Sequence, residues 1–216
     1  MAQYGFHFDS SRCTGCRTCV MACKDYKDLS QTETFRKLYD FEGGTWTKQE
    51  GGAYTTNTFA YHVSVACNHC VVPACVGACA QSAIAKDADT GIVYIDAEAC
   101  TGDASCVVAC PYGAPFINQE NGLAAKCDMC QDRVTEGKMP MCVDACPLRA
   151  LEFGDFEELK AKHGEVSAIA PLPSADQTHP ALVINPSSAS KEPGDTSGVI
   201  VNELETLGAK AFTPAK

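Results

Sequence analysis

The chain reads Cys13-Thr-Gly-Cys16-Arg-Thr-Cys19-Val-Met-Ala-Cys23 near its N-terminus. Three cysteines, each spaced from the next by two residues, can wrap one iron–sulfur cluster from a single loop. The fourth cysteine, three residues further on, points towards a different cluster. This order of spacings is the run that bacterial ferredoxins use for 4Fe–4S clusters, so the segment predicts iron–sulfur chemistry in a ferredoxin-like loop.

The other cysteines fall into three more groups with ligand-like spacing. The sequence contains 15 cysteines, and the remaining groups are Cys67, Cys70, Cys75 and Cys79; Cys100, Cys106 and Cys110; and Cys127, Cys130, Cys142 and Cys146. Disulfide scaffolds are typical of secreted chains below about 100 residues with an even number of cysteines. Zinc ribbons use cysteine pairs spaced by two residues, but they do not need three cysteines in one loop. Iron–sulfur clusters are therefore favoured over disulfides and zinc.

The composition fits one or two folded units and excludes several classes of function. The 216 residues are 45% hydrophobic and 20% charged, which is typical of globular chains. The formal net charge of −10 argues against nucleic acid and anionic membranes as partners. No apolar run approaches the roughly 18 residues of a membrane span, and we expect no signal peptide. Motifs for nucleotides, flavins or hydrolysis are also missing, so the sequence predicts a conduit for single electrons and not an enzyme.

An internal repeat runs through the cysteine-rich part of the chain. Residues 8–13 match residues 95–100, because each has an apolar residue, then Asp, then Cys four positions after the Asp. Each start predicts a strand that enters a cysteine loop. Residues 79–84 match residues 146–151, and each of these ends predicts a short helical turn that leads into another strand.

The repeat predicts an α+β fold of two interleaved ferredoxin-like units, each with two clusters. The predicted organisation places both units within residues 1–164, with an outer unit of 1–30 plus 122–153, an inner unit of 59–118, and an inserted hairpin region at 31–58.

The C-terminal segment 165–216 differs in composition from the rest of the chain. It is rich in Pro, Ser, Ala and Thr, and such a segment does not build a core of its own. We expect an extended tail, either disordered or laid along a larger partner, and the apolar run at 181–184 favours the partner.

The last cysteine of each group is predicted to bind a cluster other than that of its neighbours, as in two-cluster ferredoxins. This crossing predicts four ligand sets. Set 1 is Cys13, Cys16, Cys19 and Cys146; set 2 is Cys67, Cys70, Cys75 and Cys110; set 3 is Cys79, Cys100 and Cys106; and set 4 is Cys23, Cys127, Cys130 and Cys142.

Set 3 lacks one thiol, and Asp103 stands where a regular run would place the missing cysteine. Thiolates match cluster iron better than a carboxylate does. Three arrangements remain open. Set 3 binds a 4Fe–4S cluster with Asp103 as the fourth ligand, a 4Fe–4S cluster whose fourth iron carries water or hydroxide, or a 3Fe–4S cluster that lacks this iron. In the three-iron case Asp103 only caps the loop through backbone N–H groups.

Several segments beyond the bare cysteine spacing carry a family resemblance. They are YGF at 4–6, DSSRCTGC at 9–16, ACKDYKDL at 22–29, CPYGAP at 110–115, CPLRAL at 146–151, APLP at 170–173 and GDTSG at 194–198. Together they resemble the iron–sulfur subunits of the dimethyl sulfoxide reductase family of molybdenum bis-pterin oxidoreductases, and the resemblance covers nearly the whole chain.

The resemblance implies a relay of single electrons between two partners. One is a catalytic subunit that carries molybdenum bis-molybdopterin guanine dinucleotide and reduces a sulfoxide, an N-oxide, an oxyanion or a catechol hydroxyl. The other is a membrane anchor that oxidises quinol. Set 1 would lie towards the catalytic subunit and set 3 towards the anchor. The resemblance also implies a peripheral membrane complex on the extracytoplasmic face, exported through a partner's twin-arginine signal, with a cytoplasmic location as the alternative.

The sequence departs from the family pattern at set 3. Subunits of dimethyl sulfoxide reductase usually have Cys at the position of Asp103, and nitrate reductase subunits have Trp and a three-iron cluster. Ala80 also stands where relatives often have Pro. An alternative function is a free polyferredoxin or the electron subunit of another complex, such as formate dehydrogenase. The long C-terminal tail argues against a free shuttle.

Overall fold

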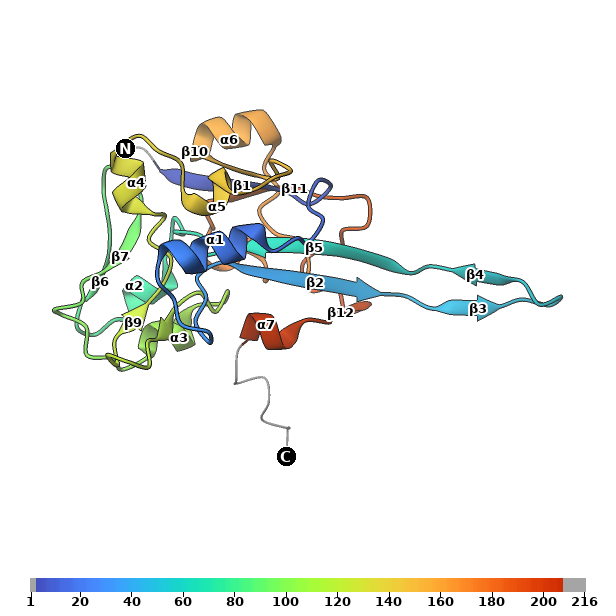
Figure 1. Cartoon of the computed structure of the whole chain (residues 1–216), viewed down its shortest axis with the longest axis horizontal. Coiled ribbons are helices and arrows are strands. Elements are labelled where there is room, and N and C mark those ends of the chain that lie inside the picture. The colour runs from blue at the N-terminus through green and yellow to red at the C-terminus, as the bar shows by residue number, and fades with distance from the viewer. Residues whose placement is uncertain (1–2, 208–216) are drawn as a thin grey trace.

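Short strands alternate with short helices in the computed structural model, which describes residues 3–207 (Figure 1). The strands are β1 (Tyr4–Asp9), β2 (Lys37–Gly43), β3 (Trp46–Lys48), β4 (Tyr54–Thr56), β5 (Phe59–Val65), β6 (Ile84–Lys86), β7 (Val93–Ile95), β8 (Phe116–Ile117), β9 (Ala124–Ala125), β10 (Leu151–Asp155), β11 (Leu182–Asn185) and β12 (Gly198–Ile200). The α-helices are α1 (Thr18–Tyr26), α2 (Ala74–Ala78), α3 (Ser105–Ala109), α4 (Gln131–Thr135), α5 (Met141–Asp144), α6 (Phe156–His163) and α7 (Glu203–Leu207). The predicted mixture of helices and strands is confirmed.

The N-terminal strand β1 is the centre of a three-stranded sheet with the order β10-β1-β11. It pairs antiparallel with β10 and parallel with β11, so strands distant in sequence meet at the N-terminus. Phe6 and Phe8 on β1 are 2% and 1% exposed and belong to the main hydrophobic core. This packing fixes the direction in which the chain enters the first cysteine loop.

A second strand pair, β6 with β7, reproduces the pairing of β10 with β1. The N–H of Asp9 donates to the carbonyl of Ala150 at 2.8 Å, and the N–H of Asp96 donates to the carbonyl of Ala83 at 2.7 Å. The helices that carry cysteines also pack in two pairs, α1 with α5 and α2 with α3. The sequence repeat thus has a counterpart in the backbone.

The region between the first two cysteine groups forms a long antiparallel hairpin of β2 and β5, extended by β3 and β4 (Figure 1). Its base lies in the main core through Leu38, Phe41 and Val63. Its outer part lies in solvent, where Trp46 is 66% exposed. The return strand β5, within the predicted inner unit, pairs with the whole of β2, from Lys37 opposite Val65 to Gly43 opposite Phe59.

The described part of the tail, residues 165–207, packs on the chain itself, which differs from the extended tail that its composition predicts. β11 adds a third strand beside β1, β12 pairs with β2, and α7 packs against β2. Asn202 links α7 to β2, since its amide donates to the carbonyl of Leu38 at 2.7 Å. The physical reason is that the apolar runs 168–172 and 181–184 are buried on this chain's own sheets. Residues 208–216 of the predicted tail lie outside the described residues.

Within residues 3–207, no helix is long and apolar enough to cross a membrane.

Candidate metal centres

The four thiols of set 1 line a single hollow next to the N-terminal core. Cys13, Cys16 and Cys19 come from the first loop and the start of α1, while Cys146 comes from the turn after α5. Gly15 has a φ of 69° and lies against His62, where a Cβ would come within 2.5 Å of the imidazole carbon Cε1. The tight coil of the loop therefore requires glycine at this position.

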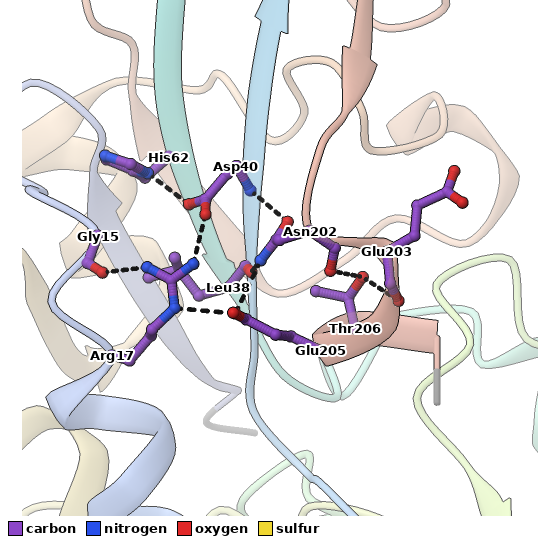
Figure 2. Close-up of polar contacts among 9 residues, drawn as sticks. All are labelled: Gly15, Arg17, Leu38, Asp40, His62, Asn202, Glu203, Glu205 and Thr206. Carbon is purple, nitrogen blue, oxygen red and sulfur yellow. Dashed lines mark hydrogen bonds and ion pairs between the residues drawn. The ribbon is translucent and has the colours of Figure 1, made fainter. Parts of the chain in front are cut away.

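The loop of set 1 is also fixed by a network around Arg17 (Figure 2). The guanidinium of Arg17 donates to the carbonyl of Gly15 at 2.6 Å and to the carboxylate of Glu205 at 2.8 Å, and it pairs with Asp40. Asp40 in turn lies 2.7 Å from Nδ1 of His62. The network joins the first cysteine loop to the hairpin strand β2 and to the C-terminal helix α7.

The four thiols of set 2 line a second hollow. Cys67 and Cys70 come from the loop after β5, Cys75 from α2, and Cys110 from the end of α3. Lys86 holds this loop, because its ammonium donates to the carbonyl of Cys70 at 2.7 Å. As in set 1, the thiols come from segments that are separate in sequence.

A third hollow is lined by the three thiols of set 3 together with Asp103; these are Cys79, Cys100, Cys106 and Asp103. The side chain of Asp103 is exposed, and its Oδ1 accepts hydrogen bonds from N–H and Oγ of Ser105 at 2.9 and 2.8 Å. These bonds lower the pKa of the Asp103 carboxyl, so it is ionised at neutral pH. A carboxylate thus stands at the hollow in the place of a thiol.

The members of set 4 lie together in the interior between α1 and α5. All four side chains are at least nine-tenths buried; they are Cys23, Cys127, Cys130 and Cys142. Burial, reinforced by the thiolate charges of Cys142 and Cys130, raises the pKa of the Cys23 thiol to about 12. Burial also raises the pKa of Cys127 well above its ordinary value, with Cys23 the next cause.

The donor sets fit iron–sulfur clusters. Residues 3–207 include all 15 cysteines, and none of them forms a disulfide. Burial raises the pKa of Cys13 to about 11 and that of Cys75 to about 12, and the charges of neighbouring thiolates add to the rise. Thiols packed in this way ionise together only beside strong positive charge, which cluster iron supplies. Each of the three hollows has an empty volume of about 270 to 360 Å³, part of which opens to solvent.

A buried arginine that the sequence analysis missed supports the same fit. Arg36 is 2% exposed, and its Nε and Nη2 have no hydrogen-bond partner within the described part of the chain. An unpaired guanidinium in a dry interior needs negative charge nearby. No motif surrounds Arg36 in the sequence, so only its tertiary environment identifies it.

The comparisons with known proteins agree with this geometry. Residues 58–156 match the family described as 4Fe-4S dicluster domain, and residues 4–25 match the 4Fe-4S binding domain. Fold and cysteine sites thus define a protein of the ferredoxin-like 4Fe–4S class.

Similar proteins narrow the class further. The chain is 51% identical to the B subunit of anaerobic dimethyl sulfoxide reductase of Escherichia coli (strain K12) over 203 residues, which cover 94% of this chain and 98% of the relative. It is 50% identical to the corresponding B subunit of Haemophilus influenzae, over 95% of this chain and 100% of that relative. The hydrogenase-2 operon protein HybA of Escherichia coli O157:H7 is 36% identical, over 77% of this chain and 56% of its own length.

The protein belongs to the family of the iron–sulfur B subunits of anaerobic dimethyl sulfoxide reductases. The predicted family is confirmed, and with it the role of a non-catalytic electron-transfer subunit of an oxidoreductase complex.

Proposed function

We propose that the chain carries single electrons through four iron–sulfur clusters to a molybdopterin catalytic subunit of dimethyl sulfoxide reductase type. The donor is a quinol-oxidising membrane anchor or another reductant. One observation carries the proposal: thiols from separate chain segments converge around shared hollows in the combinations that a two-cluster ferredoxin would use. A 4Fe–4S cluster accepts and returns one electron, and the protein supplies thiolates, spacing and exclusion of water.

The crossed ligand sets belong to this proposal. Cys146 lies at the hollow of Cys13, Cys16 and Cys19, although a large part of the chain separates it from them. Cys110 likewise lies at the hollow of set 2, away from its sequence neighbour Cys106. Both placements support the rule that the last cysteine of a group binds the other cluster.

Two interleaved ferredoxin-like units are part of the proposal, the outer one made of 1–30 plus 122–153. Pairing of β10 with β1 and packing of α1 on α5 support this outer unit. The inner unit, 59–118, repeats this arrangement with β6 on β7 and α2 on α3. Each unit would hold two clusters.

Neighbouring sets suggest an order for the relay. Three pairs of thiols link the sets: Cys19 of set 1 with Cys142 of set 4, Cys127 of set 4 with Cys67 of set 2, and Cys75 of set 2 with Cys106 of set 3. The first two pairs interact through their charges, and the third pair shares one buried apolar cluster. The path therefore runs from set 3 through sets 2 and 4 to set 1.

Set 3 holds either a 4Fe–4S cluster with Asp103 as a ligand or a 3Fe–4S cluster. Asp103 has the position for ligation, while its hydrogen bonds to Ser105 are those of a loop cap. Since only Oδ1 accepts these bonds, Oδ2 remains for iron. The aspartate can therefore cap the loop and bind iron at the same time.

Family membership supports the partners and the location that we propose. We place the chain in a complex with a molybdenum bis-molybdopterin guanine dinucleotide subunit and a membrane anchor, on the extracytoplasmic face of the membrane. The substrate of the complex is a sulfoxide, an N-oxide, an oxyanion or a catechol hydroxyl. The tail no longer argues against a free polyferredoxin, because its described part packs on its own chain. Family membership is what favours a complex.

Metal analysis of the anaerobically purified protein tests the cluster content. Four clusters of three or four irons give about 15 or 16 iron atoms per chain, with zinc near zero. About eight iron atoms in a folded protein would contradict the four-cluster proposal. Isolating the native complex and identifying its other subunits then tests the partners, and recovery of the chain alone would favour a free carrier.

A further inference from the structure

Arg36 lies at the entrance of β2, with its guanidinium inside the protein. Its Nη1 donates to Oγ of Ser64 at 3.3 Å, and the guanidinium carbon lies 4.9 Å from the centre of the Phe6 ring. Nε and Nη2 have no partner among residues 3–207. Ser64 and Phe6 therefore hold the side chain, while two of its nitrogen donors are buried without a hydrogen-bond partner among these residues.

The groups around Arg36 are thiols from two different ligand sets. Burial lowers the pKa of Arg36, but the thiolate charges at Cys142, Cys19, Cys127 and Cys23 raise it, and the net direction is upward. Cys19 belongs to set 1, and the other three belong to set 4. Ser64 adds a direct link, since its Oγ lies 3.4 Å from Sγ of Cys19 and also accepts from Arg36.

The charge of Arg36 has no carboxylate to balance it. Within residues 3–207, no Asp or Glu forms an ion pair with this arginine. An isolated buried cation is strongly destabilising. Thiolate-bound clusters at sets 1 and 4 would provide the missing negative charge.

Lys126 is also a buried cation near the cysteine sets, but its hydrogen-bond donors have partners in the protein. Lys126 donates its ammonium protons to the carbonyls of Val93 and Cys127. Its charge is therefore spread over backbone oxygens, whereas Arg36 has two donors left for cluster groups.

We propose that Arg36 is a shared positioning residue that stabilises the reduced forms of the clusters at sets 1 and 4 and so raises their reduction potentials. The proposal rests on the four-cluster function above. Adding an electron makes a cluster more negative, and an adjacent fixed cation favours that state most strongly in a medium of low dielectric constant.

The electron balance of the step is simple. One electron leaves the cluster at set 4, which is oxidised, and enters the cluster at set 1, which is reduced. Arg36 stays protonated throughout, because a guanidinium does not lose its proton in proteins. No proton moves in this step.

Potentiometric titration followed by electron paramagnetic resonance tests the proposal on the full-length protein. Arg36→Met removes the charge and keeps most of the apolar volume. At fixed potential, we expect the reduced-to-oxidised ratio of the clusters at sets 1 and 4 to fall at least tenfold, which equals about 59 mV for a one-electron couple. Sets 2 and 3 should keep their potentials. Arg36→Lys should restore part of the shift, since it returns a charge but not the planar fork.

Arg12→Met is the matched control, because Arg12 is an exposed cation directly before Cys13. Solvent screens its charge, so this variant should leave the potentials near those of the wild type. Unchanged potentials at sets 1 and 4 in an iron-replete Arg36→Met protein would overturn the proposal. If Arg36→Met fails to load iron, Arg36→Gln gives the same neutralisation with a polar side chain.

The wild-type protein offers an independent measurement. Potentials of the clusters at sets 1 and 4 should not depend on pH between about 6 and 9, since charge compensation comes from a fixed cation. A shift of about 59 mV per pH unit would show that a proton accompanies the electron, and would contradict the proposal. Absence of four clusters in the wild type would instead refute the proposed function, so the two failures can be told apart.

Discussion

The loops 13–19 and 100–106 have the same backbone path in two parts of the molecule. Gly15 and Gly102 have φ angles of 69° and 71°, and the residues two positions later, Arg17 and Ala104, have φ angles of 61° and 62°. Each loop follows a strand of a matched pair, and each is followed by a helix. The second loop thus repeats the first in conformation.

The two loops differ in what their side chains do. Cys16 lies 3.3 Å from the hydroxyl of Thr18, while Asp103, at the equivalent place, accepts from the hydroxyl of Ser105 at 2.8 Å. Arg17 ties its loop to β2 and α7 (Figure 2). The methyl group of Ala104 has no hydrogen-bonding atom to form such contacts. The comparison teaches that the loop keeps its backbone conformation whether Cys or Asp stands at this position, so the side chain can change without a change of scaffold.

The largest expected effect comes from breaking the crossed ligation of the first loop. Cys146→Ser should abolish the cluster at set 1 and destabilise the outer unit, because cluster binding is coupled to folding. Cys79→Ser is the matched change for the loop 100–106, and it should damage only the cluster at set 3. Electron paramagnetic resonance and iron analysis measure both. Loss of the set 4 cluster with set 1 intact in Cys146→Ser would show that the crossing is wrong.

The free energy of unfolding should depend on pH through His7 on β1, the strand before the first loop, and not through the matching residue on β7. His7 on β1 is 2% exposed and matches Tyr94 on β7. Burial, followed by the charge of His163, lowers the pKa of His7 from 6.5 to about 4, against the opposing charge of Glu152.

A lowered folded-state pKa means that the unfolded chain binds the proton more tightly. The stabilising contribution of neutral His7 is therefore complete above pH 6.5 and is lost as the pH falls towards about 4. The loss is on the order of 3 kcal/mol. Anaerobic denaturant unfolding should show a weaker pH dependence for His7→Phe than for the wild type. Tyr94→Phe should keep the wild-type slope, and equal slopes in all three would contradict the assignment.

Restoring the missing thiol should make the two loops alike in chemistry. Asp103→Cys should give a four-thiolate cube at set 3 with a changed reduction potential, because ligand type sets the potential. In the wild type, mild oxidation should produce a three-iron signal from set 3 before other clusters change, since an oxygen ligand holds iron less tightly. Ferricyanide titration followed by electron paramagnetic resonance compares the two proteins. Identical spectra without a three-iron signal would place Asp103 away from the cluster.

The smallest effect on stability should come from removing the side-chain bonds that tie the first loop to β2 and α7, which the second loop lacks. Arg17→Ala removes the bonds to Glu205 and Asp40, and Ala104 shows that alanine adopts this φ. We expect a loss of about 1 kcal/mol in stability and faster amide exchange in residues 198–207, with the cluster at set 1 retained. Glu205→Gln should have a smaller effect of the same sign. Unchanged exchange in both variants would mean that the network does not hold α7.

The cysteine sets could be predicted from the sequence because cluster ligation has a local signature. Spacing inside each group and the repeat of 8–13 at 95–100 were sufficient to propose which thiols meet. The position of Asp103 came from the same pattern, although spacing alone does not reveal its bonds to Ser105.

Features that depend on tertiary packing could not be predicted from the sequence. The tail has the composition of an extended segment, but its buried strand β11 exists because β1 offers an open edge. Arg36 stands between Phe35 and Lys37 and resembles a surface residue in the sequence. Its proposed role depends on the fold, which brings the charges of thiols from two sets to bear on it.

The placement of Cys146 at the first loop sets the timing of biosynthesis. Translation releases the loop 13–19 first, yet its fourth thiol follows only after a time on the order of ten seconds at ordinary elongation rates. The contact between Arg17 and Glu205 forms later still, after Glu205 has left the ribosome. With Cys146 as the proposed fourth ligand, cluster insertion at set 1 must await the synthesis of Cys146, and the first cysteines to be synthesised have to be kept reduced until then.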